Sequence, residues 1–148
     1  MPKRPLARLA RDPHFLIALA AGAVVWFIMA SIGSVPIVAE SMPVRAPWRY
    51  LTLVVLYPVA EELIFRGWLQ PTLAERLSFR ALPGVSAANF VTSSLFAVAH
   101  LPFHPPPMAI ATFFPSLVFG HFQDRYKSVV PCVLLHGFYN AGYFALFG

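Results

Sequence analysis

Five apolar segments, most of them separated by connections that contain proline, make up most of the 148-residue chain. They cover residues 14–38, 50–70, 85–101, 108–122 and 128–147, and the fourth is short for the ~20 residues that a membrane-spanning helix needs. Hydrophobic residues reach 58% and charged residues only 11%, against roughly 45–50% and 25% in soluble domains. The sequence therefore predicts an all-α integral membrane protein, in which about five transmembrane helices form a compact bundle around a buried polar site.

The basic residues predict how the chain is oriented in the membrane. Residues 1–13 read as a basic cytoplasmic tail, and residues 14–148 as a single transmembrane helical domain. With the N-terminus inside, the inner segments hold most of the Lys and Arg side chains, and only Arg45 and Arg49 fall outside. We therefore expect a cytoplasmic N-terminus and an outer C-terminus, in a bacterial inner (plasma) membrane.

Composition also excludes several classes of function. The net charge of +5 is scattered over separate connections, which argues against a nucleic-acid partner. Cys132 is the single cysteine, so an internal disulfide framework and a multi-cysteine metal site are excluded. We expect Cys132 to be a buried, inert thiol.

Two adjacent carboxylates, Glu61 and Glu62, lie within the second apolar segment, YLTLVVLYPVAEELIFRGWLQ. One charge at the centre of a spanning helix costs roughly 2.5–3.5 kcal/mol on insertion scales, so the pair requires a partner or a function. Arg66 follows Glu62 by four residues, which puts both on one helix face, whereas Glu61 points away. We expect Arg66 to neutralise Glu62 and Glu61 to be available as a general base.

Two further segments carry polar side chains at helical spacing. Phe96 and His100 are one turn apart, as are His136 and Asn140. An imidazole and an amide on one face can stabilise an oxyanion, although such residues also hold membrane helices together through hydrogen bonds. Pro58 lies one turn before the carboxylates, where it is expected either to free backbone groups for a polar cavity or to form an ordinary kink.

These residues form three motifs that resemble those of the CPBP (Abi, CAAX-protease-like) family of intramembrane glutamic proteases, in a short form. EELIFR fits EExxxR, FAVAH fits FxxxH and HGFYN fits HxxxN, in the family's order, within a core of about residues 50–143. The resemblance implies that Glu61 and His100 activate water and that His136 and Asn140 form the oxyanion hole. It assigns supporting roles to Glu62, Arg66 and Phe96.

The resemblance implies an intramembrane endopeptidase that cleaves a membrane-anchored protein or peptide with a C-terminal sorting-signal or CAAX-like segment. We favour a mechanism without a cofactor. The alternative is a zinc site formed by Glu61, His100 and His136, although the chain has no HExxH pair. The predicted depths of these residues favour a site that opens toward the outer face.

Two other functions are compatible with part of this pattern. A noncatalytic membrane protein could use the polar cluster to bind a partner helix or to relay protons. A relay needs a path from face to face, whereas these residues cluster near the middle and the outer half of the predicted spans. A serine hydrolase built on Ser93 or Ser94 with His100 lacks a motif and an orienting acid, and we reject it.

Overall fold

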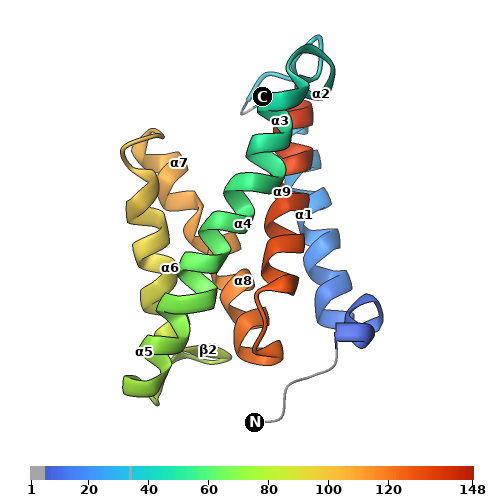
Figure 1. Cartoon of the computed structure of the whole chain (residues 1–148). Helices are drawn as coiled ribbons and strands as arrows, with labels where there is room; N and C mark the ends of the chain where they lie inside the picture. The colour runs from blue at the N-terminus through green and yellow to red at the C-terminus, as the bar shows by residue number, and fades with distance from the viewer. Residues whose placement is uncertain (1–5, 34) are drawn as a thin grey trace. The chain divides into compact units, whose positions relative to one another are not determined.

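A computed structural model describes residues 6–33 and 35–148 of the chain, which is mostly helical as predicted (Figure 1). Lys3 and Arg4 of the predicted basic tail lie outside the described residues. The helices are η1 (Leu6–Arg11), α1 (Pro13–Ser31), α2 (Met42–Arg45), α3 (Pro47–Leu51), η2 (Thr52–Leu56), α4 (Tyr57–Glu62), η3 (Leu63–Leu69), α5 (Gln70–Arg76), α6 (Ala87–His100), α7 (Pro106–Ala111), α8 (Phe113–Tyr126) and α9 (Val130–Leu146), and the strands are β1 (Arg80–Leu82) and β2 (Val85–Ser86).

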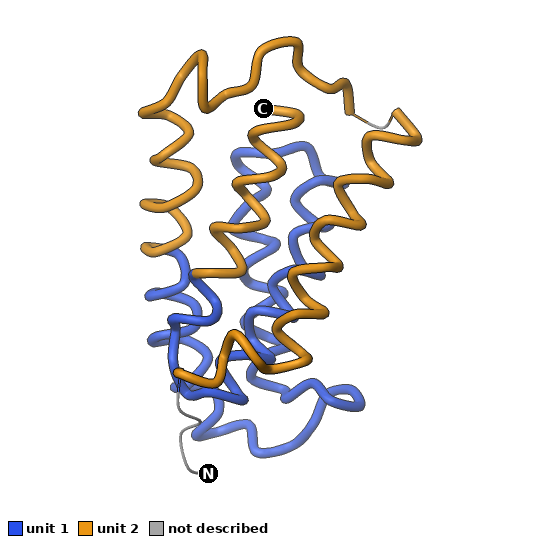
Figure 2. The backbone as a smooth tube through the Cα atoms, turned by 90° about the vertical axis from the view of Figure 1, so that its right-hand side faces the viewer, with its two compact units in different colours: residues 1–6, 61–133 blue, residues 7–60, 134–148 orange. Residues whose placement is uncertain are grey.

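The chain forms two compact units (Figure 2). One consists of Met1–Leu6 and Glu61–Val133, and is called the 61–133 unit below. The other consists of Ala7–Ala60 and Leu134–Gly148, and is called the terminal unit. The boundaries between them fall inside η1, α4 and α9, so each of these helices contributes residues to both units.

Glycines allow α1 and α9 to pack closely within the terminal unit. A Cβ on Gly22 of α1 would lie 2.7 Å from the Tyr139 ring, and one on Gly142 of α9 would overlap Trp26. The Tyr139 hydroxyl donates a hydrogen bond of 2.8 Å to the Ala18 carbonyl. Helices α1 and α9 therefore approach each other closely at Gly22 and Gly142, and aromatic rings fill the space that the two glycines leave.

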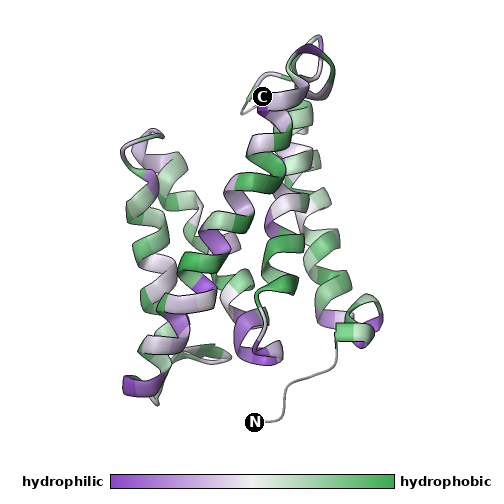
Figure 3. Ribbon diagram, viewed as in Figure 1, coloured by the Kyte–Doolittle hydropathy of each residue, from purple (hydrophilic) through white to green (hydrophobic). Residues whose placement is uncertain are grey.

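Helix α1 has the surface of a lipid-facing helix. Asp12 caps its N-terminus by accepting a hydrogen bond of 2.9 Å from the His14 amide. Large apolar side chains such as Ile17 and Phe27 are 67% and 72% exposed, and Figure 3 shows apolar residues along most of its length. Among the described residues, α1 is the one helix long and apolar enough to cross a membrane by length and composition.

The second apolar segment is helical from Pro47 to Arg76, but wide turns interrupt its α-helix. In the π-helical segment η2, the Tyr57 amide bonds to the Thr52 carbonyl, five residues back. In η3 the Gln70 amide bonds in the same way to the Phe65 carbonyl. Because these turns divide the run into short elements, the segment is not one continuous α-helix. Most residues of the five predicted spans are helical, but α1 ends at Ser31 rather than at residue 38, β2 takes the first two residues of the third span, and the fourth span is divided between α7 and α8. Their crossing of a membrane stays a prediction.

The 61–133 unit is built on the packing of α6 against α8. Gly120 of α8 lies against Asn89 of α6, whose Nδ2 donates a hydrogen bond of 3.0 Å to the Leu117 carbonyl. Ser86 caps α6 by accepting a hydrogen bond of 3.1 Å from the Asn89 amide. A short antiparallel hairpin, β1–β2, precedes α6. The all-α prediction is correct in the main and missed this hairpin, whose turn uses Gly84 at φ +80°.

Candidate active site

The predicted ion pair between Glu62 and Arg66 is present in the 61–133 unit. Arg66 Nη1 lies 3.1 Å from Glu62 Oε1, and both side chains are fully buried. Arg66 belongs to the π-helical segment η3, and Glu62 is the residue directly before this segment. A buried charge that loses its partner is strongly destabilising, typically by about 3–5 kcal/mol, so each of these residues depends on the other.

Contacts from α8 complete the surroundings of Arg66. Its Nη2 donates to the carbonyl of Ser116 at 3.0 Å and also to the Ser116 hydroxyl. The guanidinium carbon lies 4.7 Å from the ring centre of Phe96 and 5.6 Å from that of Phe119. Cation–π contacts of this kind attract a guanidinium more strongly when it is desolvated. The FxxxH phenylalanine thus lies against the EExxxR arginine, which gives Phe96 a physical role beside its place in the motif.

His100 lies at the end of α6, with its ring over that of Phe96 at a centroid distance of 4.5 Å. His100 Nδ1 is 2.8 Å from the Phe96 carbonyl oxygen. A carbonyl can only accept a hydrogen bond, so Nδ1 carries the proton and Nε2 of the neutral ring carries the lone pair. Nε2 is therefore the atom with which His100 can take a proton or bind a metal ion.

A second imidazole, that of His104, stacks on His100 with ring centres 5.8 Å apart. It belongs to the connection between α6 and α7. Partial burial, with the nearby His100 as a smaller cause, lowers the pKa of His104 below its usual value. Burial thus favours the neutral form of His104 beside the end of α6.

His136 and Asn140 lie one turn apart on α9 in the terminal unit, and His136 is 6% exposed. Asn140 Nδ2 donates a hydrogen bond of 2.9 Å to the Leu53 carbonyl. In the π register of η2 the next amide to bond that carbonyl would come from residue 58, which is a proline and has no N–H. Asn140 therefore satisfies a backbone carbonyl that Pro58 leaves without its helical partner.

Gly137 contributes to the same contact. A Cβ at this position would lie 2.8 Å from the Val54 carbonyl, which is the α-helical partner position of residue 58. The absence of a side chain at Gly137 lets α9 approach the Leu53 and Val54 carbonyls, the two positions that an N–H at residue 58 could reach in the π and α registers. The expectation that Pro58 releases backbone groups for polar contacts thus agrees with the observed Asn140 bond.

The structure groups the site residues predicted from the sequence within two units. Glu61, Glu62, Arg66, Phe96 and His100 belong to the 61–133 unit, and His136 and Asn140 belong to the terminal unit. Glu61 is half-buried. The roles of these residues stay predictions. Ser93 and Ser94 donate to Asn89 Oδ1 and to the Phe90 carbonyl respectively, as helix-packing serines do.

Sequence reasoning missed the residues of α8 that hold the buried polar side chains. Glu62, Arg66 and Gln70 follow one another at intervals of four, and so do Ser116, Gly120 and Asp124. Arg66 bonds to Ser116, and Gln70 bonds to the Gly120 carbonyl and to Asp124 Oδ1. The interval of four was the available signal, because it places each set on one helix face.

Cys132 is fully buried, as predicted, and its Sγ donates to the Phe119 carbonyl at 3.1 Å. No group of three or more His, Cys, Asp or Glu side chains placed to hold a metal ion is found in the described part of the chain. Zinc ligation by Glu61, His100 and His136 stays an alternative prediction.

The helical fold, the lipid-facing surface of α1 and the buried acidic and basic pair are features of a membrane-embedded helical protein. Residues 43–142 match the family described as type II CAAX prenyl endopeptidase Rce1-like. The chain belongs to this Rce1-like family, whose members are membrane-integral proteases of the CAAX type. The resemblance inferred from the three motifs is thus confirmed. Comparison with curated proteins and with solved structures finds no match.

Proposed function

We propose that the chain is an intramembrane endopeptidase in which Glu61, assisted by His100, takes a proton from water. The water attacks the scissile carbonyl, and His136 and Asn140 stabilise the oxyanion that forms. The proton then passes to the leaving amine. The substrate is a membrane-anchored protein or peptide whose C-terminal segment resembles a sorting signal or a CAAX sequence.

The difference in burial between the two adjacent carboxylates carries this assignment. Glu62 is fully buried and paired with Arg66 at 3.1 Å, whereas Glu61 is half-buried. A general base must reach a water molecule, and a carboxylate sealed beside a guanidinium cannot. Glu61 is therefore the member of the pair that we propose as the base, and Glu62 anchors the turn that presents it.

The local chemistry of His100 and Asn140 supports their proposed roles. The Phe96 carbonyl holds the Nδ1 proton of His100 and leaves Nε2 to accept a proton. An amide nitrogen carries two hydrogens, and Asn140 donates one of them to the Leu53 carbonyl. The other hydrogen is the one that we assign to the oxyanion.

Glu61→Gln and Glu62→Gln in the purified protein test the assignment. Glu61→Gln is expected to abolish cleavage of a quenched fluorescent peptide with little change in the melting temperature, because glutamine keeps the size but cannot take the proton. Glu62→Gln is expected to act mainly by lowering the melting temperature, because it leaves Arg66 without its counter-charge. A farnesylated CAAX peptide and an unprenylated anchored peptide serve as parallel substrates. Wild-type activity of Glu61→Gln on either peptide would refute the role of Glu61.

A further inference from the structure

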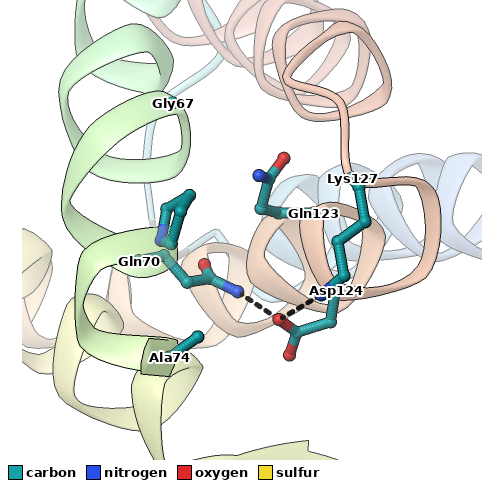
Figure 4. Close-up of a pocket in the computed structure, with 7 residues that line it drawn as sticks. Gly67, Gln70, Ala74, Gln123, Asp124 and Lys127 are labelled. Atoms are coloured by element: carbon teal, nitrogen blue, oxygen red, sulfur yellow. Dashed lines mark hydrogen bonds and ion pairs between the residues drawn. The ribbon is translucent and has the colours of Figure 1, made fainter. Parts of the chain in front are cut away.

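A pocket of about 260 Å³ lies between the junction of η3 with α5 and the C-terminal end of α8 in the 61–133 unit (Figure 4). Its lining consists of Gly67, Gln70, Pro71, Ala74, Gln123, Asp124 and Lys127. None of these residues takes part in the chemistry proposed above. Figure 4 shows the amide of Gln70 turned toward Asp124, and the amide of Gln123 in the space between Gly67 and Lys127.

Gln70 presents an unpaired acceptor in this pocket. Its side chain is 1% exposed, and its Nε2 donates at 2.9 Å both to the Gly120 carbonyl and to Asp124 Oδ1. An amide nitrogen has two hydrogens, so both are committed and the orientation of the amide is fixed. Oε1 has no hydrogen-bond partner among the described residues. A buried acceptor in that state costs about 1–3 kcal/mol, and a donor would remove this penalty.

Gln123 adds a second acceptor of the same kind. It is 7% exposed, and its Oε1 also lacks a hydrogen-bond partner within residues 6–33 and 35–148. Asp124 contributes a carboxylate, whose Oδ2 accepts a hydrogen bond of 2.6 Å from the Ser86 hydroxyl. The polar wall of the pocket is thus rich in acceptors, and it favours a ligand group that carries several N–H or O–H donors.

Lys127 brings a positive charge to the rim of the pocket. Its Nζ lies 3.9 Å from Asp124 Oδ1, a loose pair, and its side chain is 42% exposed. A ligand that fits both parts of the pocket is zwitterionic, with a donor-rich cation for the acceptors and an anion for Lys127. The helical surface that precedes the pocket exposes Leu63, Ile64 and Trp68 by 53%, 54% and 64%, as a lipid-facing surface does.

We propose that this pocket binds the headgroup of a phosphatidylethanolamine molecule. The ammonium donates its three hydrogens among Gln70 Oε1, Gln123 Oε1 and Asp124, and the phosphate pairs with Lys127. Phosphatidylcholine has the same phosphate, but its quaternary ammonium has no hydrogen to donate. The pocket therefore distinguishes two lipids that differ only at their nitrogen.

The test uses the purified protein in nanodiscs of phosphatidylcholine alone or of phosphatidylcholine with an equal share of phosphatidylethanolamine. Phosphatidylethanolamine is expected to raise the melting temperature by on the order of 5 °C, because a ligand that binds only the folded state stabilises it. Native mass spectrometry is expected to find this lipid retained on the protein. Equal melting temperatures in the two nanodiscs, with no retained lipid, would overturn the proposal.

Variants separate the pocket from a general effect of the bilayer. Gln123→Leu keeps a similar volume and removes one acceptor, so it should lose most of the lipid-dependent shift without losing stability in phosphatidylcholine alone. Lys127→Asn removes the charge, and asparagine tolerates the φ of +53° at this position. It should weaken lipid retention.

Arg76→Asn is the matched control, since Arg76 is an exposed cation at the end of α5 that does not line the pocket. This variant should keep the full rise in melting temperature that phosphatidylethanolamine causes. A shift of wild-type size in Gln123→Leu would overturn the proposal. So would equal stabilisation by soluble glycerophosphoethanolamine, which would show that the occupant is not a membrane lipid. None of these readouts depends on proteolysis, so a failure here is distinguishable from a failure of the proposed function.

Discussion

At the scale of single residues, Arg66 connects its own helical run with α6 and α8 in the 61–133 unit. It pairs with Glu62, donates to Ser116 and packs against Phe96. A guanidinium has five N–H donors in a rigid plane, and a buried one needs partners from more than one direction. The contacts from α8 thus determine how firmly Glu62 is held beside Glu61.

Ser116→Ala is expected to lower the free energy of unfolding by about 1.5–3 kcal/mol, the range for a hydrogen bond to a charged group. The hydroxyl of Ser116 is a partner of Arg66 Nη2 that alanine cannot replace. Ser94→Ala is the control, because the Ser94 hydroxyl bonds only to a carbonyl of its own helix, that of Phe90. Chemical denaturation of both variants measures the difference, and equal losses would contradict the proposed importance of the Ser116 contact.

Asn140 has an observed role and a proposed one, and a double-mutant cycle with Pro58 separates them. Asn140→Ala leaves the Leu53 carbonyl unsatisfied, so it is expected to cost about 1–3 kcal/mol of stability and to lower kcat by about 10²- to 10³-fold. Pro58→Ala supplies the missing N–H. In that background the stability cost of Asn140→Ala should shrink, while the loss in kcat should persist.

Thermal unfolding and turnover, measured on the two single variants and the double variant, complete the cycle. Recovery of kcat in the double variant would show that Asn140 acts on catalysis only through helix packing. An unchanged stability cost would show instead that Pro58 does not create the need for the Asn140 bond.

At the scale of helices and strands, the packing of α6 on α8 depends on one position without a side chain. A Cβ on Gly120 would overlap the Asn89 amide, which bonds the Leu117 carbonyl. The overlap involves a buried side chain held at both ends of its amide, because Ser93 also donates to Asn89 Oδ1. The contact therefore has little freedom to adjust.

Gly120→Ala is expected to destabilise the protein by about 1–3 kcal/mol, the usual cost of an overpacked core, despite the better helix propensity of alanine. Gly67→Ala is the comparison, since its Cβ would meet Val129 Cγ1 at 3.3 Å and otherwise make ordinary contacts, with the Glu62 carbonyl at 3.8 Å and Leu63 Cδ2 at 4.0 Å. The melting temperatures of the two variants provide the measurement. If Gly120→Ala melts at the wild-type temperature, α6 and α8 do not require this close contact.

The helices were predictable from apolar segment lengths, and the Glu62–Arg66 pair from an interval of four residues. The wide turns of η2 and η3 were not, because nothing in local composition distinguishes a bond to the fifth residue back from one to the fourth. The bonds from Arg66 to Ser116 and from Asn140 to Leu53 join residues 50 and 87 positions apart. Such pairs depend on the register between helices, which a hydropathy pattern does not contain.

At the scale of the whole molecule, the helices η1, α4 and α9 are each divided between the two units, and the family match includes residues of both units. Residues 43–142 include all three motifs. We propose that the chain crosses a bacterial inner membrane five times, with its N-terminus in the cytoplasm and its active site open to the outer face. In this proposed topology the entrance to the site and most of the basic connections lie at opposite faces of the membrane.

Cysteine labelling in intact cells tests this topology. In a Cys132→Ala background, a cysteine at position 104 is expected to react with an impermeant maleimide added from outside. A cysteine at position 80 is the control and should react only after the cytoplasmic side is opened, because the β1–β2 hairpin follows the second predicted span. Reaction of position 104 from the cytoplasmic side alone would reverse both the topology and the proposed entrance.

The wide turn η3 also bears on how the chain tolerates changes in its length. A π-helical turn holds one residue more than an α-helical turn of the same height. Deleting one residue between Gly67 and Leu69 would let the run relax to an ordinary α-helix without breaking it. Because the residue removed is the extra one of the wide turn, the part beyond the deletion would keep nearly its orientation relative to Arg66. Gln70 would still face Asp124, and Glu62 and Arg66 would keep their spacing. A single codon deletion here is thus expected to spare both the proposed lipid pocket and the ion pair.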